Sequence, residues 1–208
     1  ALKYKLREIT LEDFSTQVKK LATVNTDWFD ILFRNPFSHT HNLSISGGSD
    51  QAAYRASFGI SDVNNTARGN GQTRYNGNLN VSSTFWERVT ASFSLAGSYT
   101  KTKAFVGTDP YAYASKSSRT IACYDENGDY FFYPSSNGYR YNFLFEKEHS
   151  GNENTQSGLN SSLSLRFAIA DGLVFQSLLG YNYSSVHGET YYSEQSNYIT
   201  NIRGYEYH

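Results

Sequence analysis

Apolar and polar residues alternate along most of the chain from Thr40 onward, with a period of two. Such alternation is typical of β-strands that present one face to an apolar surrounding and the other to water. Turn residues such as Gly48-Ser49-Asp50 and Asp171-Gly172 interrupt the pattern. We therefore predict six antiparallel strands in up-and-down order, each about ten residues long, over the approximate ranges 40–47, 54–61, 74–85, 91–100, 159–169 and 173–183.

The predicted connections alternate in length. Those after the first, third and fifth strands are short, whereas longer ones run from Asp62 to Thr73, from Lys101 to Ser157 and beyond Ser185. Outer-membrane β-barrels have short periplasmic turns and long extracellular loops. Their strands carry a wet polar face and an outward apolar face edged by aromatic rings. Aromatic residues that fit such an edge are Tyr75, Trp86, Tyr99, Tyr181 and Tyr183.

The first residues follow different patterns. Leu2 to Arg7 alternates as a short strand does, and Thr10 with Asp13 forms a capping-box pattern before apolar residues at helical spacing. We predict a helix from Leu11 to about Thr23 and no other helix. The predicted fold class is all-β, an antiparallel up-and-down β-meander from a transmembrane β-barrel, with one short N-terminal helix. The predicted division is 1–24, a strand and a helix, and 25–208, barrel strands with an extracellular loop at about 101–157.

Composition narrows the function classes. The net charge is −1, so no basic face for nucleic acid is indicated. Hydrophobic residues make up only 38% of the chain while aromatic residues reach 16%, which fits strands with one apolar face. Cys123 is the single cysteine, which excludes a disulfide within the chain and indicates a buried or loop thiol. No signal peptide is visible, and we expect an internal segment of a longer protein.

Several motifs together resemble the SusC/RagA family of TonB-dependent outer-membrane proteins. They match in order and spacing, and the clear resemblance runs from about Asn25 to Thr100. The chain departs from the family pattern between Asp62 and Thr73, where a simple turn is usual. The matching segments are Asn25-Thr26-Asp27-Trp28-Phe29, His41-Asn42-Leu43-Ser44-Ile45-Ser46-Gly47-Gly48-Ser49, Tyr54-Arg55-Ala56-Ser57-Phe58-Gly59, Arg74-Tyr75-Asn76 and Asn78-Leu79-Asn80.

The resemblance implies a location in the cell outer membrane and a role in nutrient import. Family members close a 22-stranded barrel around a plug domain and take up glycan or peptide oligomers with energy passed on by TonB. They work with a SusD-like surface lipoprotein that acts as a lid. This chain resembles a barrel segment that follows the plug, so its implied partners are the SusD-like lipoprotein, TonB through the missing plug region, the oligomeric substrate and outer-membrane lipid.

The predicted loop at 101–157 is rich in aromatic residues, which can stack on sugars or anchor peptides. One interpretation is contact with substrate or with the lid protein, and the other is a loop that packs on itself. The candidate ligand-binding residues are Tyr111, Tyr113, Tyr130, Phe132, Tyr133, Tyr139 and Tyr141.

Other candidate chemistry in the sequence is weak. Asp125 to Asp129 has the spacing of half a calcium loop, but its glycine is misplaced, so a hairpin with an Asn-Gly turn is favoured. The acidic residues Glu146, Glu148 and Glu153, with His149, are expected on a solvated stretch without a pocket that would tune them for glycoside hydrolysis. We therefore expect no enzyme, no metal site and no cofactor.

An alternative function is a soluble secreted β-domain that binds carbohydrate through Tyr and Phe. The two hypotheses differ in the fate of the apolar face. A transporter segment exposes that face to lipid or to a partner chain, whereas a soluble domain buries it between two sheets. The residues that decide are Leu43, Ile45, Phe93, Leu95, Leu163 and Leu165.

Overall fold

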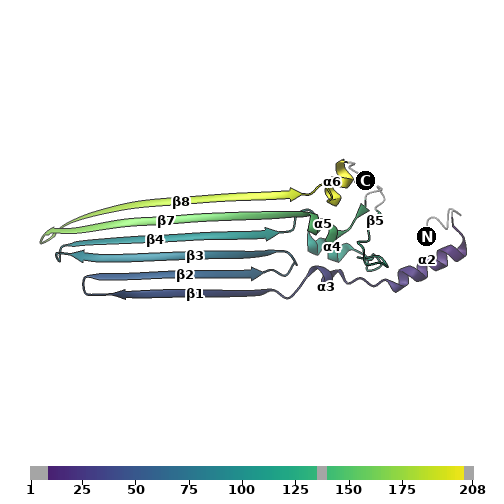
Figure 1. Ribbon diagram of the computed structural model, residues 1–208, viewed down its shortest axis with the longest axis horizontal. Coiled ribbons are helices and arrows are strands. Elements are labelled where there is room, and N and C mark those ends of the chain that lie inside the picture. Colours follow the sequence, from purple (N-terminus) through teal and green to yellow (C-terminus); the bar gives the residue numbers. More distant parts are fainter. Residues whose placement is uncertain (1–8, 135–139, 204–208) are drawn as a thin grey trace. The chain divides into compact units, whose positions relative to one another are not determined.

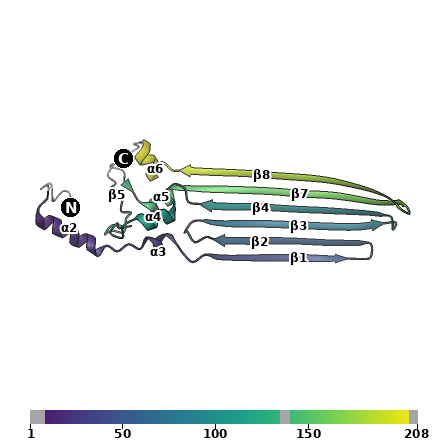
Figure 2. The same cartoon turned by 180° about the vertical axis from the view of Figure 1, so that it is seen from behind.

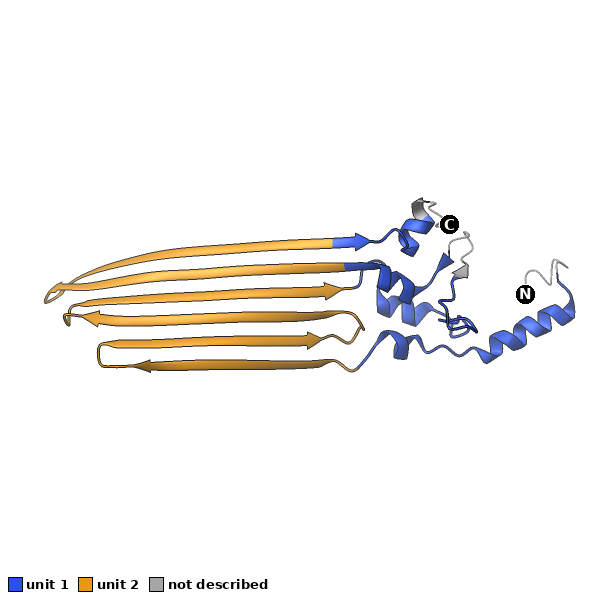
Figure 3. Ribbon diagram, in the orientation of Figure 1, with its two compact units in different colours: residues 1–34, 105–151, 190–208 blue, residues 35–104, 152–189 orange. Residues whose placement is uncertain are grey.

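A computed structural model describes residues 9–134 and 140–203. The chain forms two compact units, each assembled from separate parts of the sequence (Figure 3). Unit 1 comprises residues 1–34, 105–151 and 190–208, and unit 2 comprises residues 35–104 and 152–189. The predicted strand at Leu2 to Arg7 lies outside the described residues. The predicted division at residue 24 stays a prediction.

Unit 2 is built on one antiparallel sheet with the order β1-β2-β3-β4-β7-β8 (Figure 1). Consecutive strands are neighbours throughout, which confirms the predicted meander. The view from behind shows the same order (Figure 2). The strands are β1 (Phe37–Gly48), β2 (Ala52–Asn64), β3 (Gly71–Phe85), β4 (Val89–Ala104), β7 (Ser150–Ala170) and β8 (Leu173–Tyr192).

The strands are longer than the alternating pattern predicts. β7 has 21 residues and β8 has 20, so the predicted loop boundaries are wrong. The connection between β2 and β3 shrinks to residues 65–70, and the one between β4 and β7 to residues 105–149. The extra length is polar on both faces at the start of β7, where Asn152 to Thr155 pair with Ala104 to Lys101. Backbone pairing extends these strands where side-chain alternation gives no signal.

The register places apolar residues opposite one another on one face of the sheet. Leu43 pairs with Phe58, and Ala56, Leu79 and Leu95 follow one another across β2, β3 and β4. Most large apolar side chains on this face are exposed, with 75% of the surface of Leu43 and 45% of that of Leu163 accessible, while Leu79 and Leu95 are half-buried. No second sheet covers these side chains within the described part of the chain. The burial expected of a soluble sandwich is therefore not found.

The apolar belt has well-defined edges. On β3 it runs from Tyr75 to Phe85, about ten residue steps or roughly 33 Å along the strand. At the strand tilt of about 40° that is usual in outer-membrane barrels, this length would span about 25 Å, the height of their apolar band. Tyr75 lies beside Tyr99 at one edge, with 6.4 Å between ring centroids. Beyond them the same face turns polar, with Asp62, Thr73 and Lys101 in register.

The Gly47-Gly48 pair has a structural reason at each position. A Cβ atom at Gly47 would lie 2.7 Å from the hydroxyl oxygen of Tyr54, because that aromatic side chain covers Gly47 from the neighbouring strand. A Cβ atom at Gly48 would lie 2.5 Å from the backbone oxygen of Ala52. The tight β1–β2 turn and the packing of Tyr54 therefore both require glycine.

Unit 1 contains short helices and a small two-stranded sheet. The predicted N-terminal helix is confirmed as α2 (Leu11–Thr23), including the capping box between Thr10 and Asp13. The expectation of no further helix is wrong. The four other helices have only five to seven residues, fewer than two full turns, so the apolar pattern of a helix cannot recur along them. The remaining elements are α3 (Trp28–Leu32), α4 (Pro110–Lys116), α5 (Phe143–His149), α6 (Asn197–Arg203), β5 (Tyr133–Pro134) and β6 (Arg140–Tyr141). No helix among the described residues is long and apolar enough to cross a membrane.

Candidate functional site in the aromatic segment

The buried core of unit 1 joins residues that are far apart in the sequence. Trp28 and Leu32 on α3 meet Ala114 on α4, Cys123, and Phe143 on α5. Each of the five has at most 6% of its surface exposed. The described part of the 105–149 connection thus shares a hydrophobic core with α3.

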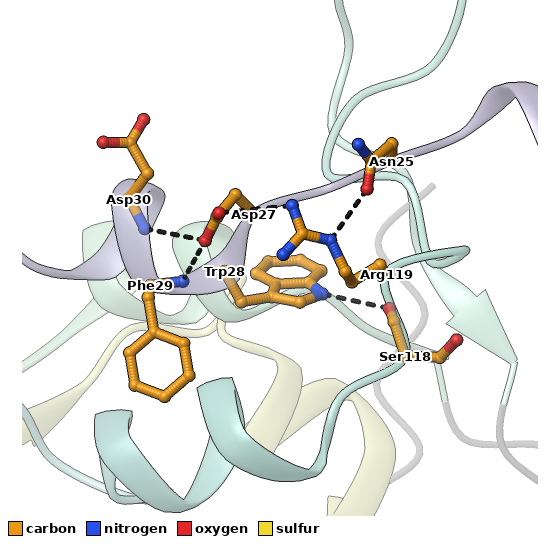
Figure 4. A network of polar contacts seen from close by, with 7 residues as sticks. All are labelled: Asn25, Asp27, Trp28, Phe29, Asp30, Ser118 and Arg119. Carbon is orange, nitrogen blue, oxygen red and sulfur yellow. Dashed lines mark hydrogen bonds and ion pairs between the residues drawn. The ribbon is translucent and has the colours of Figure 1, made fainter.

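Polar contacts fix α3 to the connection at one point (Figure 4). Arg119 donates to Asn25 Oδ1 through Nε at 2.7 Å and to Asp27 Oδ2 through Nη2 at 3.2 Å. Trp28 Nε1 donates to the backbone oxygen of Ser118 at 3.2 Å. Asp27 also caps α3, and its bond from the Asp30 N–H, together with Arg119, lowers the pKa of the Asp27 carboxyl. The Asn-Thr-Asp-Trp motif therefore attaches the aromatic connection to the segment before β1.

Asn142 is the polar centre of unit 1. Its amide nitrogen donates to the backbone oxygens of Cys123 at 2.8 Å and Phe131 at 3.0 Å, while its amide oxygen caps α5. Asn197 Nδ2 donates in turn to the backbone oxygen of Asn142 at 2.9 Å. Both side chains are buried. A buried amide that satisfies several backbone groups at once holds those segments in one arrangement.

The seven predicted aromatic residues separate into groups with different environments. Tyr113 packs edge-on against Trp28 at 5.1 Å and also contacts Phe143 and Tyr141. Burial raises the pKa of both Tyr113 and Tyr141. These two tyrosines support the core of the connection, so for them the interpretation of a loop that packs on itself agrees with the structure.

The other described aromatic residues lie nearer the surface. Tyr111 has 64% of its surface exposed and touches Phe29. Tyr130 stacks on Tyr124 at 5.4 Å, and Phe132 lies beneath the guanidinium of Arg140 at 5.7 Å. The backbone of Tyr133 belongs to β5, and Tyr139 lies outside the described residues. Of these residues Tyr111 is the most exposed, whereas Tyr130 and Phe132 are half-buried and pack edge-on against Phe145.

A groove of about 750 Å³ lies between α2 and the segment 120–131. Leu21 and Val24 line it from α2, and Tyr124, Asp125 and Phe131 line it from the other side. Lys20 and Glu126 form an ion pair across it at 2.7 Å, with both side chains largely exposed. Its volume is that of a small-molecule site. The sequence does not predict this groove, because its two sides are a helix and a hairpin that lie about 100 residues apart in the chain.

The hairpin favoured at Asp125 is the structure found. Tyr124 and Tyr130 form an antiparallel bridge, and Gly128 has a positive φ of 89° in the turn. Asp125 Oδ1 accepts from the N–H groups of Asn127 and Asp129, at 2.8 and 3.0 Å. Its carboxylate therefore supports the turn.

The expectation of a solvated stretch around Glu146 is wrong. Glu146 lies on α5, has 3% of its surface exposed and accepts from the Tyr198 N–H at 3.3 Å. His149 stacks on Phe145 at 4.0 Å, and its Nε2 lies 3.0 Å from Gln195 Oε1. These residues join α5 to the segment that precedes α6. The sequence here is polar and α5 has only seven residues, so no local pattern indicates that one face of this helix is buried.

Comparison with known proteins agrees with these arrangements. No protein-family model matches the chain. SusC, a TonB-dependent receptor of Bacteroides thetaiotaomicron, is 37% identical over 67 residues, which cover 32% of this chain and 7% of SusC. Solved structures of the RagAB peptide importer match in its "closed-closed" and "open-open" states, with TM-scores of 0.67 and 0.66 and 21% identity. These matches cover 81% and 79% of this chain, and 20% and 19% of the matched chains.

The chain is a SusC/RagA-like segment. The sequence match carries the likeness to SusC, and the structural match shows that this chain shares the fold of part of the RagAB chain. The chain spans about a fifth of the RagAB chains that it matches. In this SusC/RagA-like segment, the sequence located the strands and the Thr-Asp-Trp motif. It missed Asn142 and Arg119, whose roles arise from contacts with residues distant in the sequence.

Proposed function

We propose that the chain forms part of the barrel wall and one extracellular segment of a TonB-dependent outer-membrane importer. The observation that carries the proposal is the exposed apolar belt of the sheet, which on β3 runs from Tyr75 to Phe85 and has Tyr75 and Tyr99 side by side at one edge. The polar face of the same strands suits a wet lumen. The likeness to a TonB-dependent receptor and to the fold of a peptide importer supports the same conclusion.

In this proposal the aromatic segment acts outside the membrane. Its ordered core holds Tyr111, Tyr130 and Phe132 toward an incoming glycan or peptide oligomer, or toward a SusD-like surface lipoprotein that closes over it. Aromatic rings suit both tasks because they provide large contact areas at low entropy cost. The groove beside Tyr124 adds a concave surface of suitable size. TonB would act through the plug region of the whole protein.

The test uses the full-length parent protein. Its complex is extracted from outer membranes in detergent, and mass spectrometry determines whether a SusD-like lipoprotein accompanies it. Co-purification with that lipoprotein supports a two-part nutrient importer. A parent protein found in a soluble fraction, without membrane association and without lipoprotein, overturns the proposal.

A matched pair of variants then tests the extracellular segment. Tyr111→Ala removes an exposed ring, whereas Tyr113→Phe keeps the buried ring and deletes only its hydroxyl group. We expect Tyr111→Ala to weaken retention of the lipoprotein or of bound oligomer, and Tyr113→Phe to leave both unchanged. Equal retention by the two variants would remove Tyr111 from the proposed contact surface.

A further inference from the structure

The charges of the sheet are separated by face. Arg55, Arg74 and Arg166 lie at polar-face positions, as their partners show: Arg55 pairs with Ser46 and Asn80, Arg74 with Ser61 and Thr100, and Arg166 with Thr90. The acidic residues of the six strands are Asp62, Glu153 and Glu189. The alternation along their strands places all three on the opposite face of the sheet. The polar face of these described strands therefore carries three cations and no carboxylate.

These three arginines have no partner on the sheet. All are exposed, and within the described ranges none of their side chains forms a hydrogen bond or an ion pair. By contrast, Lys101 on the other face is paired with Glu153 at 2.5 Å. A guanidinium group offers five donors in a planar arrangement that matches carboxylate oxygens. The polar wall thus presents unused donors with positive charge.

The arginines lie at successive levels along the strands. Counted on β4, Arg74 is level with Thr100, Arg55 with Ser94 and Arg166 with Thr90. The steps between these levels are about 20 Å and about 13 Å at the usual rise per residue. The arrangement is a ladder of positive charges that runs from the loop end of the sheet toward its short turns.

The middle arginine, Arg55, is one of the residues that line an open hollow of about 290 Å³. Besides Arg55, its polar lining includes Asn80, Ser82, Ser92, Ser94 and Ser162. The serines pair by their hydroxyl groups, Ser82 with Ser92 at 3.0 Å and Ser94 with Ser162 at 2.7 Å. In each pair one hydroxyl donates, so the other keeps a hydrogen for a ligand. The hollow therefore combines a cation with hydroxyl and amide donors.

We infer that this arginine ladder guides an acidic oligosaccharide, one that carries carboxylate groups, along the barrel wall. The inference rests on the proposed function, because only a transporter places this face in a lumen. Charge complementarity requires an anionic ligand. The hydroxyl-rich lining favours a glycan over a peptide, since peptides are recognised by free strand edges or by pockets for apolar side chains. The polar wall around Arg55 offers small polar side chains instead.

The experiment measures equilibrium binding to the full-length protein, extracted together with any lipoprotein that accompanies it. The probes are a trigalacturonate, an uncharged trisaccharide of equal length and tri-glutamate. Wild-type protein should prefer the trigalacturonate, and its affinity should fall as salt is raised. The triple variant Arg55→Gln, Arg74→Gln, Arg166→Gln should bind it at least about tenfold more weakly, because charge-assisted hydrogen bonds are lost. Lys103→Gln, which removes one cation from the other face, should change little.

Several results would overturn the inference. Equal affinity for charged and uncharged trisaccharides is one, and a preference for tri-glutamate, which indicates an acidic peptide instead, is another. A triple variant whose plug becomes protease-sensitive would show that the arginines hold the rest of the protein. The salt dependence of the wild-type protein needs no variant and decides the matter if the triple variant does not assemble. Membrane location and lipoprotein co-purification, measured on the same preparations, show whether the proposed function fails as well.

Discussion

The two units of this chain are stabilised in different ways. Unit 2 is a ladder of backbone hydrogen bonds between consecutive strands, and its largest apolar side chains remain exposed. Unit 1 is smaller and irregular, yet it contains the five-residue hydrophobic core. A sheet of this kind requires its surroundings to cover its apolar face, whereas unit 1 covers its own. The comparison teaches that the sheet depends on what covers its apolar face, a bilayer in the proposed function, whereas unit 1 depends on its own core.

The largest expected effect comes from removing Trp28, with the exposed Trp86 as a control. Trp28→Ala empties the centre of unit 1 and should destabilise it by about 3–5 kcal/mol. Trp86→Ala, at a turn residue with 87% of its surface exposed, should change little and serves as the control. Hydrogen exchange should show loss of protection over residues 105–149 in Trp28→Ala while the sheet stays protected. Equal loss in both units would show that they are not independent in stability.

A charge on either face of β3 tests the wall. Leu79→Arg places a cation in the middle of the apolar belt and should destabilise the barrel by about 2–4 kcal/mol. Asn78→Arg introduces the same residue on the opposite, polar face, where its strand partners Ser57 and Ala96 carry no charge, and should be tolerated. The measurement is urea unfolding of the full-length protein in lipid vesicles. If Asn78→Arg proves the more damaging change, the assignment of the two faces is reversed.

Removing the buried amide of Asn142 should destabilise unit 1 by less than Trp28→Ala does, and it tests a single polar contact point. Asn142→Ala removes one of the two donors to the backbone oxygen of Cys123 and the side-chain donor to the backbone oxygen of Phe131, and should cost about 1–3 kcal/mol. Asn127→Ala in the exposed turn is the matched control. Alkylation of Cys123, followed by peptide mass spectrometry, reports the opening of unit 1. We expect faster labelling in the first variant alone, and similar rates in both would remove Asn142 from its central role.

We expect rising pH to destabilise unit 1 at a lower pH than the sheet of unit 2. Burial raises the pKa of the Cys123 thiol from 9.0 to about 11, so the folded state holds its proton more tightly than the unfolded state. The stability from this group is complete below pH 9 and is lost as the pH rises toward 11. The raised pKa values of Tyr113 and Tyr141 act in the same direction. Proteolysis of residues 105–149 should therefore increase over this range, whereas a rise on acidification alone would contradict the assignment.

The wall could be predicted from the sequence and unit 1 largely could not, for a physical reason. In strands such as β3, every second residue is apolar, which identifies the two faces of the strand. Glycine positions such as Gly48 mark the turns. The roles of Arg119 and Asn142 depend on partners that are distant in the sequence, which no local pattern records. The short helix α5 was mistaken for a solvated stretch because only its fold shows that Glu146 is buried. The sequence shows which residues of the connection are aromatic, but it does not show which of them form the core.

The most direct test of the central claim is the topology of the chain in the outer membrane of intact cells. The full-length protein with Cys123→Ser would carry a single new cysteine, either Asn127→Cys in the hairpin of the aromatic segment or Asp50→Cys in the β1–β2 turn. With a maleimide reagent that does not cross the membrane, we predict labelling of Asn127→Cys in intact cells and of Asp50→Cys only after the membrane is disrupted. The reverse order, or equal labelling of both in a soluble fraction, would contradict the account.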